Sequence, residues 1–189
     1  MAPTFLFAIL MVYFPTLVAF IETPGKPGPV LLIFLTTCVL MFLIIFVLQK
    51  MKLISRITLE NQRERYIPQV ILSLIYLLIT GYLAYRYGLR DGFTLSMIAS
   101  SLTAVGITLI NRFWKISTHA SGVAGVFGIV SVLFLHHQVN GFFPVYLTIC
   151  FLTLAVCLAR LYLKVHTPMQ VVCGFLLGGV SGVLLFFYK

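Results

Sequence analysis

Long apolar runs follow one another along almost the whole chain, and each has nearly the length that a helix needs to cross a bilayer. A helix rises about 1.5 Å per residue and the hydrocarbon core is about 30 Å thick, so one crossing takes about 20 apolar residues. We therefore predict an all-α integral membrane protein, a bundle of six to seven transmembrane helices. The predicted spans are residues 4–21, 29–48, 67–85, 93–110, 120–135, 143–163 and 168–188.

The composition excludes a soluble domain. Hydrophobic residues make up 61% of the chain and charged residues only 9%, whereas a soluble surface needs roughly a quarter charged residues. The spans leave room for little else, so residues 1–189 are expected to form a single transmembrane domain. The net charge of +9 would suggest nucleic acid for a soluble protein, but here the basic residues stand at span ends, beside lipid headgroups. We expect the bilayer and a lipid phosphate as partners, and no nucleic acid.

Two short polar clusters interrupt the apolar pattern. The first polar cluster is residues 115–119, and the second polar cluster is residues 160–170. Two predicted spans separate the basic stretch 49–66 from the first cluster, and two more separate the first cluster from the second. Because an even number of crossings returns the chain to the same face, all three segments are expected on one side of the membrane.

Each polar cluster leads into the N-terminus of a predicted helix, where unpaired backbone N–H groups and the helix dipole favour an anion. In the first cluster, Ser117 or Thr118 is a good N-cap. In the second, Thr167 at the N-cap, Pro168 at the first helical position and Gln170 three residues after the cap predict a capping box. Two potential anion sites therefore open on one side of the membrane.

Glycines recur at three- and four-residue spacing in the predicted spans 120–135 and 168–188. Such spacing lets two helix backbones approach closely. If these two faces pack on each other, the N-termini of the two helices converge and the two anion sites merge.

The side chains of the clusters suit phosphate chemistry. Lys115 and Arg160 carry fixed positive charge, and a guanidinium can grip phosphate oxygens with two parallel hydrogen bonds. His119 and His166 are imidazoles that titrate near neutral pH. One can attack phosphorus while the other protonates the leaving oxygen. Neither cluster contains a carboxylate, and this scheme needs no metal and no other cofactor.

These residues resemble the motifs of the type 2 phosphatidic acid phosphatase (PAP2) superfamily of membrane lipid phosphatases. Ser117-Thr-His119 fits the family's Ser-x-His motif, with Thr where Gly is usual. Two spans later, Arg160, His166 and Gln170 fit its Arg-x5-His-x3-Asp motif except at the last position. The resemblance covers about 75 residues and implies a PAP2-like helical bundle.

The resemblance also implies a role for each residue. His166 would be the nucleophile that forms a phosphohistidine, and His119 the general acid. Arg160 and Ser117 would hold the phosphate. Gln170 stands where the family has an aspartate, and it can still accept a hydrogen bond from the imidazole N–H without supplying a charge.

The family's first motif, Lys-x6-Arg-Pro, does not occur in this chain. Its basic ligands have two possible replacements, Arg112 with Lys115 or the pair Arg63 and Arg65, and we favour Lys115 acting jointly with Arg65. Thr118 and Arg63 complete the set of candidate phosphate ligands.

The resemblance predicts a metal-independent lipid phosphatase that removes a phosphate monoester or a terminal diphosphate phosphate. The substrate classes are phosphatidate, phosphatidylglycerophosphate, a polyprenyl diphosphate or a phosphorylated lipid A, and the expected location is the cytoplasmic (inner) membrane of a bacterium. Two alternatives stay open: a phosphotransferase that uses the same phosphohistidine, and a non-catalytic lipid-binding or transport protein that retains the fold.

Overall fold

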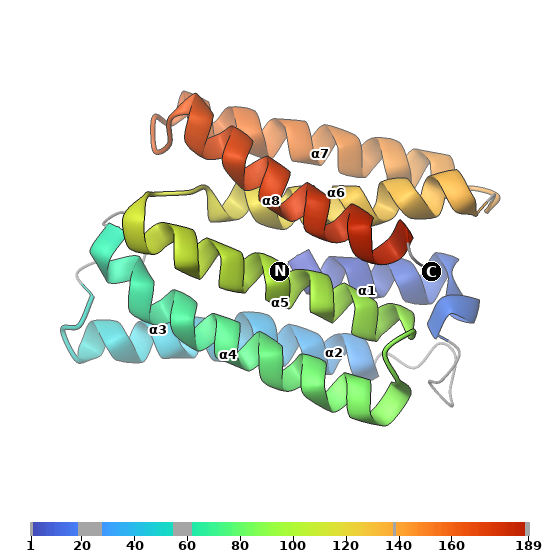
Figure 1. The fold of residues 1–189 in the computed structure, drawn as a ribbon, viewed down its shortest axis with the longest axis horizontal. Coiled ribbons are helices and arrows are strands. Elements are labelled where there is room, and N and C mark those ends of the chain that lie inside the picture. The colour runs from blue at the N-terminus through green and yellow to red at the C-terminus, as the bar shows by residue number, and fades with distance from the viewer. Residues whose placement is uncertain (1, 19–27, 55–61, 138, 188–189) are drawn as a thin grey trace.

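The computed structural model describes residues 2–18, 28–54, 62–137 and 139–187, and all regular secondary structure in these residues is helical (Figure 1). The second apolar run forms one continuous helix with a π-helical turn in its middle. The elements are α1 (Ala2–Tyr13), the 3-10 turn η1 (Pro15–Val18), α2 (Gly28–Phe34), the π-helical turn η2 (Leu35–Val39), α3 (Leu40–Lys50), α4 (Gln62–Tyr87), α5 (Gly92–Phe113), α6 (Thr118–His136), α7 (Phe142–Tyr162) and α8 (Pro168–Phe187).

The predicted all-helical membrane bundle is confirmed. Among the described residues, 5 helices are long and apolar enough to cross a membrane, and two shorter apolar helices accompany them. Large apolar side chains cover the outside of the bundle: Leu78 is 74% exposed and Phe151 is 70% exposed. Such a surface is unfavourable in water and is the expected one where lipid is the solvent. The long helices are Leu31–Lys50, Glu64–Tyr87, Gly92–Phe113, Thr118–His136 and Phe142–Tyr162, and the shorter ones are Ala2–Tyr13 and Pro168–Leu184.

The first apolar run differs from the single span predicted over residues 4–21. Its α-helix ends at Tyr13, and the chain continues as the short 3-10 turn from Pro15. Proline has no N–H to donate and its ring collides with the carbonyl four residues earlier, so Pro15 stops the α-helix. Residues 19–21 of the predicted run lie outside the described part of the chain.

The third predicted span begins earlier than expected. We placed its start at residue 67, next to Pro68, but α4 already includes Gln62 and carries Pro68 in its interior. Proline costs one backbone hydrogen bond near the start of a helix, and α4 continues through it. Arg65 therefore projects from the first turns of a helix and not from a loop.

The helices α6 and α8 pack with their backbones in close approach, as their glycines predicted. A Cβ atom added at Gly174 would lie 2.6 Å from the carbonyl oxygen of Ser117, and one at Gly182 would lie 2.6 Å from that of Gly125. A Cβ at Gly178 would collide with the backbone of Ser121. No larger residue fits at these positions unless the helices separate. This packing brings the N-termini of α6 and α8 together.

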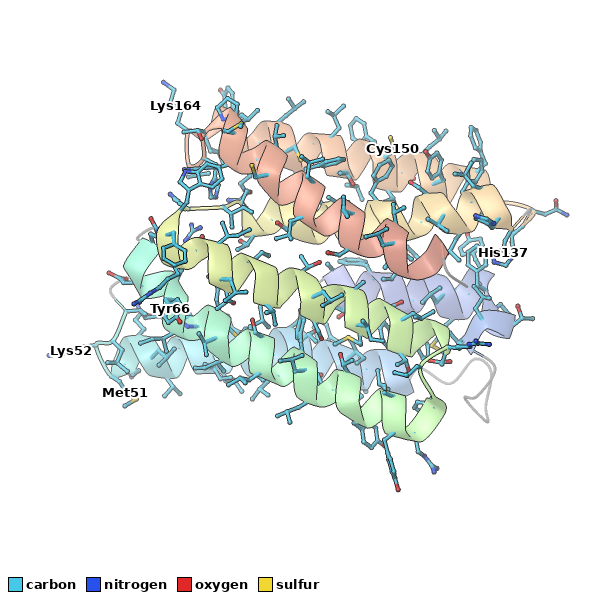
Figure 2. All side chains as sticks on the ribbon, in the orientation of Figure 1. Met51, Lys52, Tyr66, His137, Cys150 and Lys164 are labelled. Carbon is cyan, nitrogen blue, oxygen red and sulfur yellow. The ribbon has the colours of Figure 1, made fainter. Side chains whose placement is uncertain are left out.

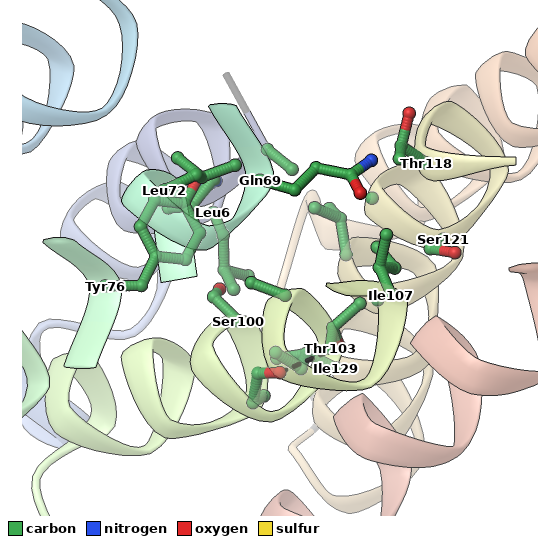
Figure 3. Close-up of a pocket in the computed structure, with 17 residues that line it drawn as sticks. Leu6, Gln69, Leu72, Tyr76, Ser100, Thr103, Ile107, Thr118, Ser121 and Ile129 are labelled. Carbon is green, nitrogen blue, oxygen red and sulfur yellow. Dashed lines mark hydrogen bonds between the residues drawn. The ribbon is translucent and has the colours of Figure 1, made fainter. Parts of the chain in front are cut away.

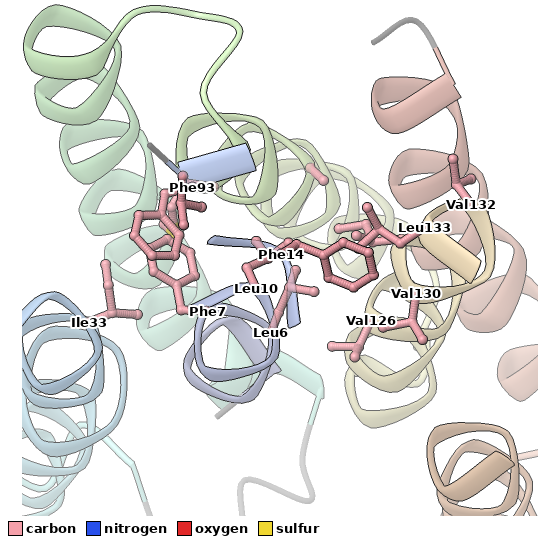
Figure 4. Close-up of a cluster of buried hydrophobic side chains, with 14 of the residues drawn as sticks. Leu6, Phe7, Leu10, Phe14, Ile33, Phe93, Val126, Val130, Val132 and Leu133 are labelled. Carbon is pink, nitrogen blue, oxygen red and sulfur yellow. The ribbon is translucent and has the colours of Figure 1, made fainter. Parts of the chain in front are cut away.

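An apolar core fixes the end of the bundle where α5 begins (Figure 4). The ring of Phe7 on α1 stacks on that of Phe93 at the start of α5, with centroids 4.3 Å apart. Leu6 and Leu10 of α1 are fully buried in the same cluster, which also includes Leu133 near the end of α6. In a bilayer, the close van der Waals packing of these side chains holds the helices together, since lipid tails are as apolar as the core.

The polar segments share one end of the bundle, as the count of crossings predicted. Figure 2 shows Lys52, Tyr66 and Lys164 at one end and His137 at the other. Side-chain hydrogen bonds join α4 to α5 along the way to the polar end. They link Thr80 Oγ1 to Ser101 Oγ (2.7 Å), Ser73 Oγ to Thr108 Oγ1 (2.9 Å) and Asn111 Nδ2 to Gln69 Oε1 (2.8 Å).

Candidate active site

The first polar cluster forms the capped start of α6. Ser117 has extended backbone angles, and its Oγ accepts a hydrogen bond from the N–H of Ala120 at 3.4 Å. Its carbonyl oxygen accepts from both the N–H and the hydroxyl of Ser121, at 3.1 and 3.0 Å. Of the two N-cap candidates, Ser117 is therefore the cap, and it is fully buried. Thr118 is the first helical residue, which makes His119 the second.

The second polar cluster forms the predicted capping box. The N–H of Thr167 donates to Gln170 Oε1 at 3.2 Å, and the N–H of Gln170 donates to Thr167 Oγ1 at 3.4 Å. Pro168 is the first residue of α8, where its missing N–H costs nothing. The start of α8 is held in one conformation by these two reciprocal bonds.

Gln170 also fixes the imidazole of His166. Its Oε1 lies 3.1 Å from His166 Nδ1, and the Thr167 N–H bonded to the same atom identifies that atom as the amide oxygen. An amide oxygen only accepts, so Nδ1 of His166 must carry the proton that it donates. In the neutral ring, Nε2 then keeps its lone pair. This tautomer is the one that a nucleophilic histidine needs.

Two hydrogen bonds join the clusters to each other. The N–H of Ser117 donates to the carbonyl oxygen of Gln170 at 3.2 Å, and Lys115 Nζ donates to the carbonyl oxygen of Val165 at 3.0 Å. An open pocket of about 530 Å³ lies between Lys115, His166 and Gln170, with Lys164 and Thr167 at its edge. It holds an ammonium group and the ring of His166 within one space.

Positive charge gathers around both histidines. The charges of Arg65, Lys115 and Arg160 act on His166, and those of Arg65 and Arg160 act on His119. His119 and His166 are also close enough to influence each other electrostatically. Residues from α4, the α5–α6 connection, α6, α7 and the start of α8 therefore meet at one place.

Burial and charge favour the neutral form of His166. The ring is 7% exposed, and this burial is the largest cause that lowers its pKa from the ordinary value of a histidine. The positive charges of Arg65, Lys115 and Arg160 lower the pKa further, while the hydrogen bond to Gln170 acts in the opposite direction. Because a neutral imidazole is the form that attacks, the surroundings favour the reactive state near neutral pH.

The remaining candidate ligands are Thr118, Arg63 and Arg112. Thr118 Oγ1 is 3.5 Å from His119 Nδ1, a long contact. The side chain of Arg63 lies outside the described residues. Arg112, one of the two replacements considered for the missing motif, places its guanidinium 5.5 Å from the ring centre of Tyr66. That contact directs Arg112 toward α4.

Sequence reasoning missed Asn111, which is 2% exposed and connects the site to α4. Its Oδ1 accepts from the N–H of Ile116 at 3.0 Å, just before Ser117. Its Nδ2 donates to Gln69, and its backbone carbonyl accepts from Gln62 Nε2 at 2.9 Å. The only sequence signal was a polar residue at the end of an apolar run. Its partners on α4 are more than 40 positions away.

One acidic residue lies far from the site. Asp91 is the N-cap of α5 at the other end of the bundle, and its Oδ2 accepts from the N–H groups of Phe93 and Thr94. Within the described residues, no three His, Cys, Asp or Glu side chains gather in a way that could hold a metal ion. The site offers two imidazoles, three cations and two helix N-termini, which is an arrangement for a phosphate group.

The fold and the site together define a helical membrane protein with two histidines, positive charge and two helix N-termini gathered at one end of its bundle. The family model described as PAP2 superfamily matches residues 94–189, just over half of the chain, so the chain belongs to this family. The matched part contains all but the first two residues of α5, the helices α6 to α8, and both polar clusters. Membership indicates phosphatase activity on phosphate esters, which in this family typically needs no metal ion. No curated protein and no solved structure matches the chain.

Proposed function

We propose that this protein is a metal-independent lipid phosphatase that hydrolyses a phosphate monoester or a terminal diphosphate through a phosphohistidine at His166. The observation that carries the proposal is the 3.1 Å contact between His166 Nδ1 and Gln170 Oε1, an oxygen that can only accept a hydrogen bond. With Nδ1 bonded to Gln170, Nε2 of the neutral ring keeps a lone pair, and three cations act on the same ring.

In the first step, Nε2 of His166 attacks phosphorus and the bond from phosphorus to the lipid oxygen breaks. His119 takes up a proton once the dianionic phosphate offsets the surrounding positive charge, and it donates that proton to the leaving oxygen. The lipid leaves as an alcohol, or as a monophosphate if the substrate is a diphosphate. In the second step, water attacks the phosphohistidine and His119 accepts a proton from it. Inorganic phosphate leaves and His166 returns to its neutral form. Gln170 holds the Nδ1–H throughout and acts as an orienting residue.

The phosphate oxygens would be bound by Arg160, Lys115 and Arg65, with a bidentate contact available to each guanidinium. The N–H groups in the first turns of α6 and α8 add partial positive charge. Ser117 accepts the cap bond with its Oγ and is fully buried, so it would support the phosphate through the α6 N-terminus that it caps. Thr118 and Arg63 remain candidate ligands at the edge of this group.

The test is phosphate release from a panel of lipid phosphates, with a metal chelator present throughout. We expect release by the wild type and none by His166→Ala. His136→Ala is the matched control, because His136 is an exposed histidine at the far end of the same bundle. Substrate labelled in the phosphate should also leave an acid-labile label on the wild-type protein, whereas the His166→Ala variant should stay unlabelled.

Equal release by His166→Ala and the wild type would refute the proposal, and so would a requirement for Mg²⁺. An acceptor alcohol added to the same assay separates hydrolysis from phosphotransfer. A phosphotransferase would convert the alcohol into a new phosphomonoester at the expense of inorganic phosphate. A protein that binds lipid phosphates and releases nothing in any of these assays would be non-catalytic.

A further inference from the structure

A second cavity, of about 130 Å³, lies inside the bundle between α1, α4, α5 and α6 (Figure 3). Its wall is mostly apolar and includes Leu6 of α1, Leu72 and Tyr76 of α4, Ile107 of α5, and Val126 and Ile129 of α6. We call it the chain pocket. Two of its four helices, α1 and α4, precede the residues that match the family.

The chain pocket begins beside the candidate active site and runs into the bundle. Figure 3 shows Gln69 and Thr118 facing each other on one side of the pocket, and Thr118 directly precedes His119. Along α6, the wall extends from Thr118 to Ile129, which is about 16 Å at about 1.5 Å per residue. That depth is about half of a bilayer hydrocarbon core. The pocket therefore connects the polar end of the bundle with the level of the lipid chains.

Three of the hydroxyl groups in the wall are already used as donors. Ser100 donates to the carbonyl of Ser96 at 2.8 Å, and Thr103 donates to that of Ala99 at 2.8 Å. Ser121 donates to the carbonyl of Ser117 at 3.0 Å. A buried water needs about two to four polar partners, and this wall presents few free ones. An apolar occupant suits the pocket better than water.

The volume sets the size of that occupant. An engineered apolar cavity of about 150 Å³ stays dry and takes up one benzene molecule. A pocket of about 130 Å³ has a similar capacity, which corresponds to one slender hydrocarbon segment. Two chains side by side would not fit.

We infer that the chain pocket binds one apolar chain of the lipid phosphate substrate while the phosphate lies at the histidines. This inference rests on the proposed function and adds to it the site that binds the substrate's chain. The substrate carries at least one slender hydrocarbon chain that enters between α1, α4, α5 and α6, and any second chain stays outside the bundle. The fit of that chain contributes to KM.

Gly122 offers the sharpest test, because it lines the chain pocket and is not part of the chemistry. A Cβ added there would meet only the Cβ of Ala2, at 3.7 Å, an ordinary contact. Gly122→Ala should be tolerated, and Gly122→Leu should fill part of the pocket. Gly81→Leu on α4 is the matched control, since a Cβ at Gly81 meets nothing within 4 Å and Gly81 does not line the pocket.

The experiment compares a long-chain lipid phosphate with a chain-free phosphomonoester, each assayed for phosphate release. For Gly122→Leu we expect KM for the long-chain substrate to rise at least tenfold, with a smaller rise for Gly122→Ala. The kcat/KM for the chain-free substrate should stay within about twofold of wild type in both variants, which also shows that they fold. Gly81→Leu should match the wild type on both substrates.

Equal losses on the two substrates, or no loss on the long-chain substrate, would overturn the inference. Binding of the same long-chain lipid phosphate in the His166→Ala background gives a readout that needs no turnover. There we expect Gly122→Leu to weaken binding at least tenfold and Gly81→Leu to leave it unchanged. A wild type that binds the lipid through the chain pocket and releases no phosphate would refute the proposed function alone.

Discussion

Replacing Gln170 by Glu tests the site at its most unusual position. The two side chains have nearly the same shape, so a carboxylate oxygen can accept the hydrogen bonds that Gln170 now accepts from His166 Nδ1 at 3.1 Å and from the Thr167 N–H at 3.2 Å. A glutamate at this position also completes the most common form of the capping box. The change therefore preserves the geometry and adds one negative charge beside the imidazole.

The size and sign of the effect follow from that charge. Two opposite unit charges about 4 Å apart attract each other by about 4 kcal/mol at an effective dielectric constant of about 20. Gln170 is half-buried and borders an open pocket, so solvent screening reduces this value substantially. We expect the pKa of His166 to rise by about one unit, the low end of the range of about 1–3 units for a neighbouring opposite charge.

In the wild type, burial and three cations lower the pKa of His166, so its reactive neutral form persists on the acid side of neutrality. In Gln170→Glu the imidazole should accept a proton at higher pH, and the acid limb of kcat/KM should move upward by about one pH unit. The pH dependence of folding stability should change in the same direction as the acid limb. Because the wild-type pKa is lowered on folding, the folded state loses stability as pH falls below about 6.5, and this loss should be smaller in the variant.

The assay is the initial rate of phosphate release from about pH 4.5 to about pH 9 for the wild type, Gln170→Glu and Gln170→Leu. The leucine variant removes both accepted bonds, and we expect at least a tenfold lower kcat across the whole range, because each lost bond is worth about 1 kcal/mol. If Gln170→Glu keeps the wild-type acid limb, then Gln170 does not contact the group that titrates, and the role assigned to His166 is refuted.

Three further changes test the frame of the site. Gly178→Ala should lower the thermal midpoint and the activity, since its Cβ collides with Ser121 and overpacking costs about 1–3 kcal/mol, whereas Gly81→Ala should melt like the wild type. Lys115→Met removes the bond to the Val165 carbonyl and one phosphate ligand, so KM should rise about tenfold with a smaller change in kcat, and an unchanged KM would exclude Lys115 as a ligand. Asn111→Leu leaves the buried hydrogen-bond partners of Asn111 unpaired, at a cost of about 1–3 kcal/mol. Its activity should fall at temperatures where circular dichroism still reports a folded bundle, and parallel loss of both signals would limit Asn111 to a structural role.

Local rules predicted the parts of this molecule that depend on neighbouring residues. Span positions follow from the length of apolar runs, and the caps at Ser117 and Thr167 follow from side chains that bond within three residues. The rules failed where two opposing local effects compete, as at Pro15, which ends α1, and Pro68, which α4 passes through. Long-range contacts escaped them as well. Nothing near Asn111 in the sequence identifies its partners on α4, because only the packed bundle brings them together.

Local rules could not predict the chain pocket either, because four helices contribute to it and no single segment of the sequence indicates it. The approach of α6 and α8 was predictable because glycine spacing records a close contact in the sequence of each helix. From the sequence, Arg65 was only one of two possible sources of the missing basic ligand, the other being Arg112 with Lys115. The position of Arg65 near both histidines depends on where α4 begins and on how α4 packs on α5.

A neutral residue at position 170 should divide catalysis and binding differently from a carboxylate. Three cations act on His166, and Gln170 leaves all of that charge available to the dianionic phosphate, which favours a low KM. The same neutrality leaves the positive charge that develops on the attacking imidazole without a partner, which lowers kcat. We therefore expect Gln170→Glu to raise kcat and KM together, because the carboxylate stabilises the charged ring and repels the phosphate. Measured at the optimum pH of each protein, a rise in kcat with unchanged KM would place position 170 outside the electrostatic reach of the substrate, and a fall in kcat would show that a neutral partner suits this histidine better.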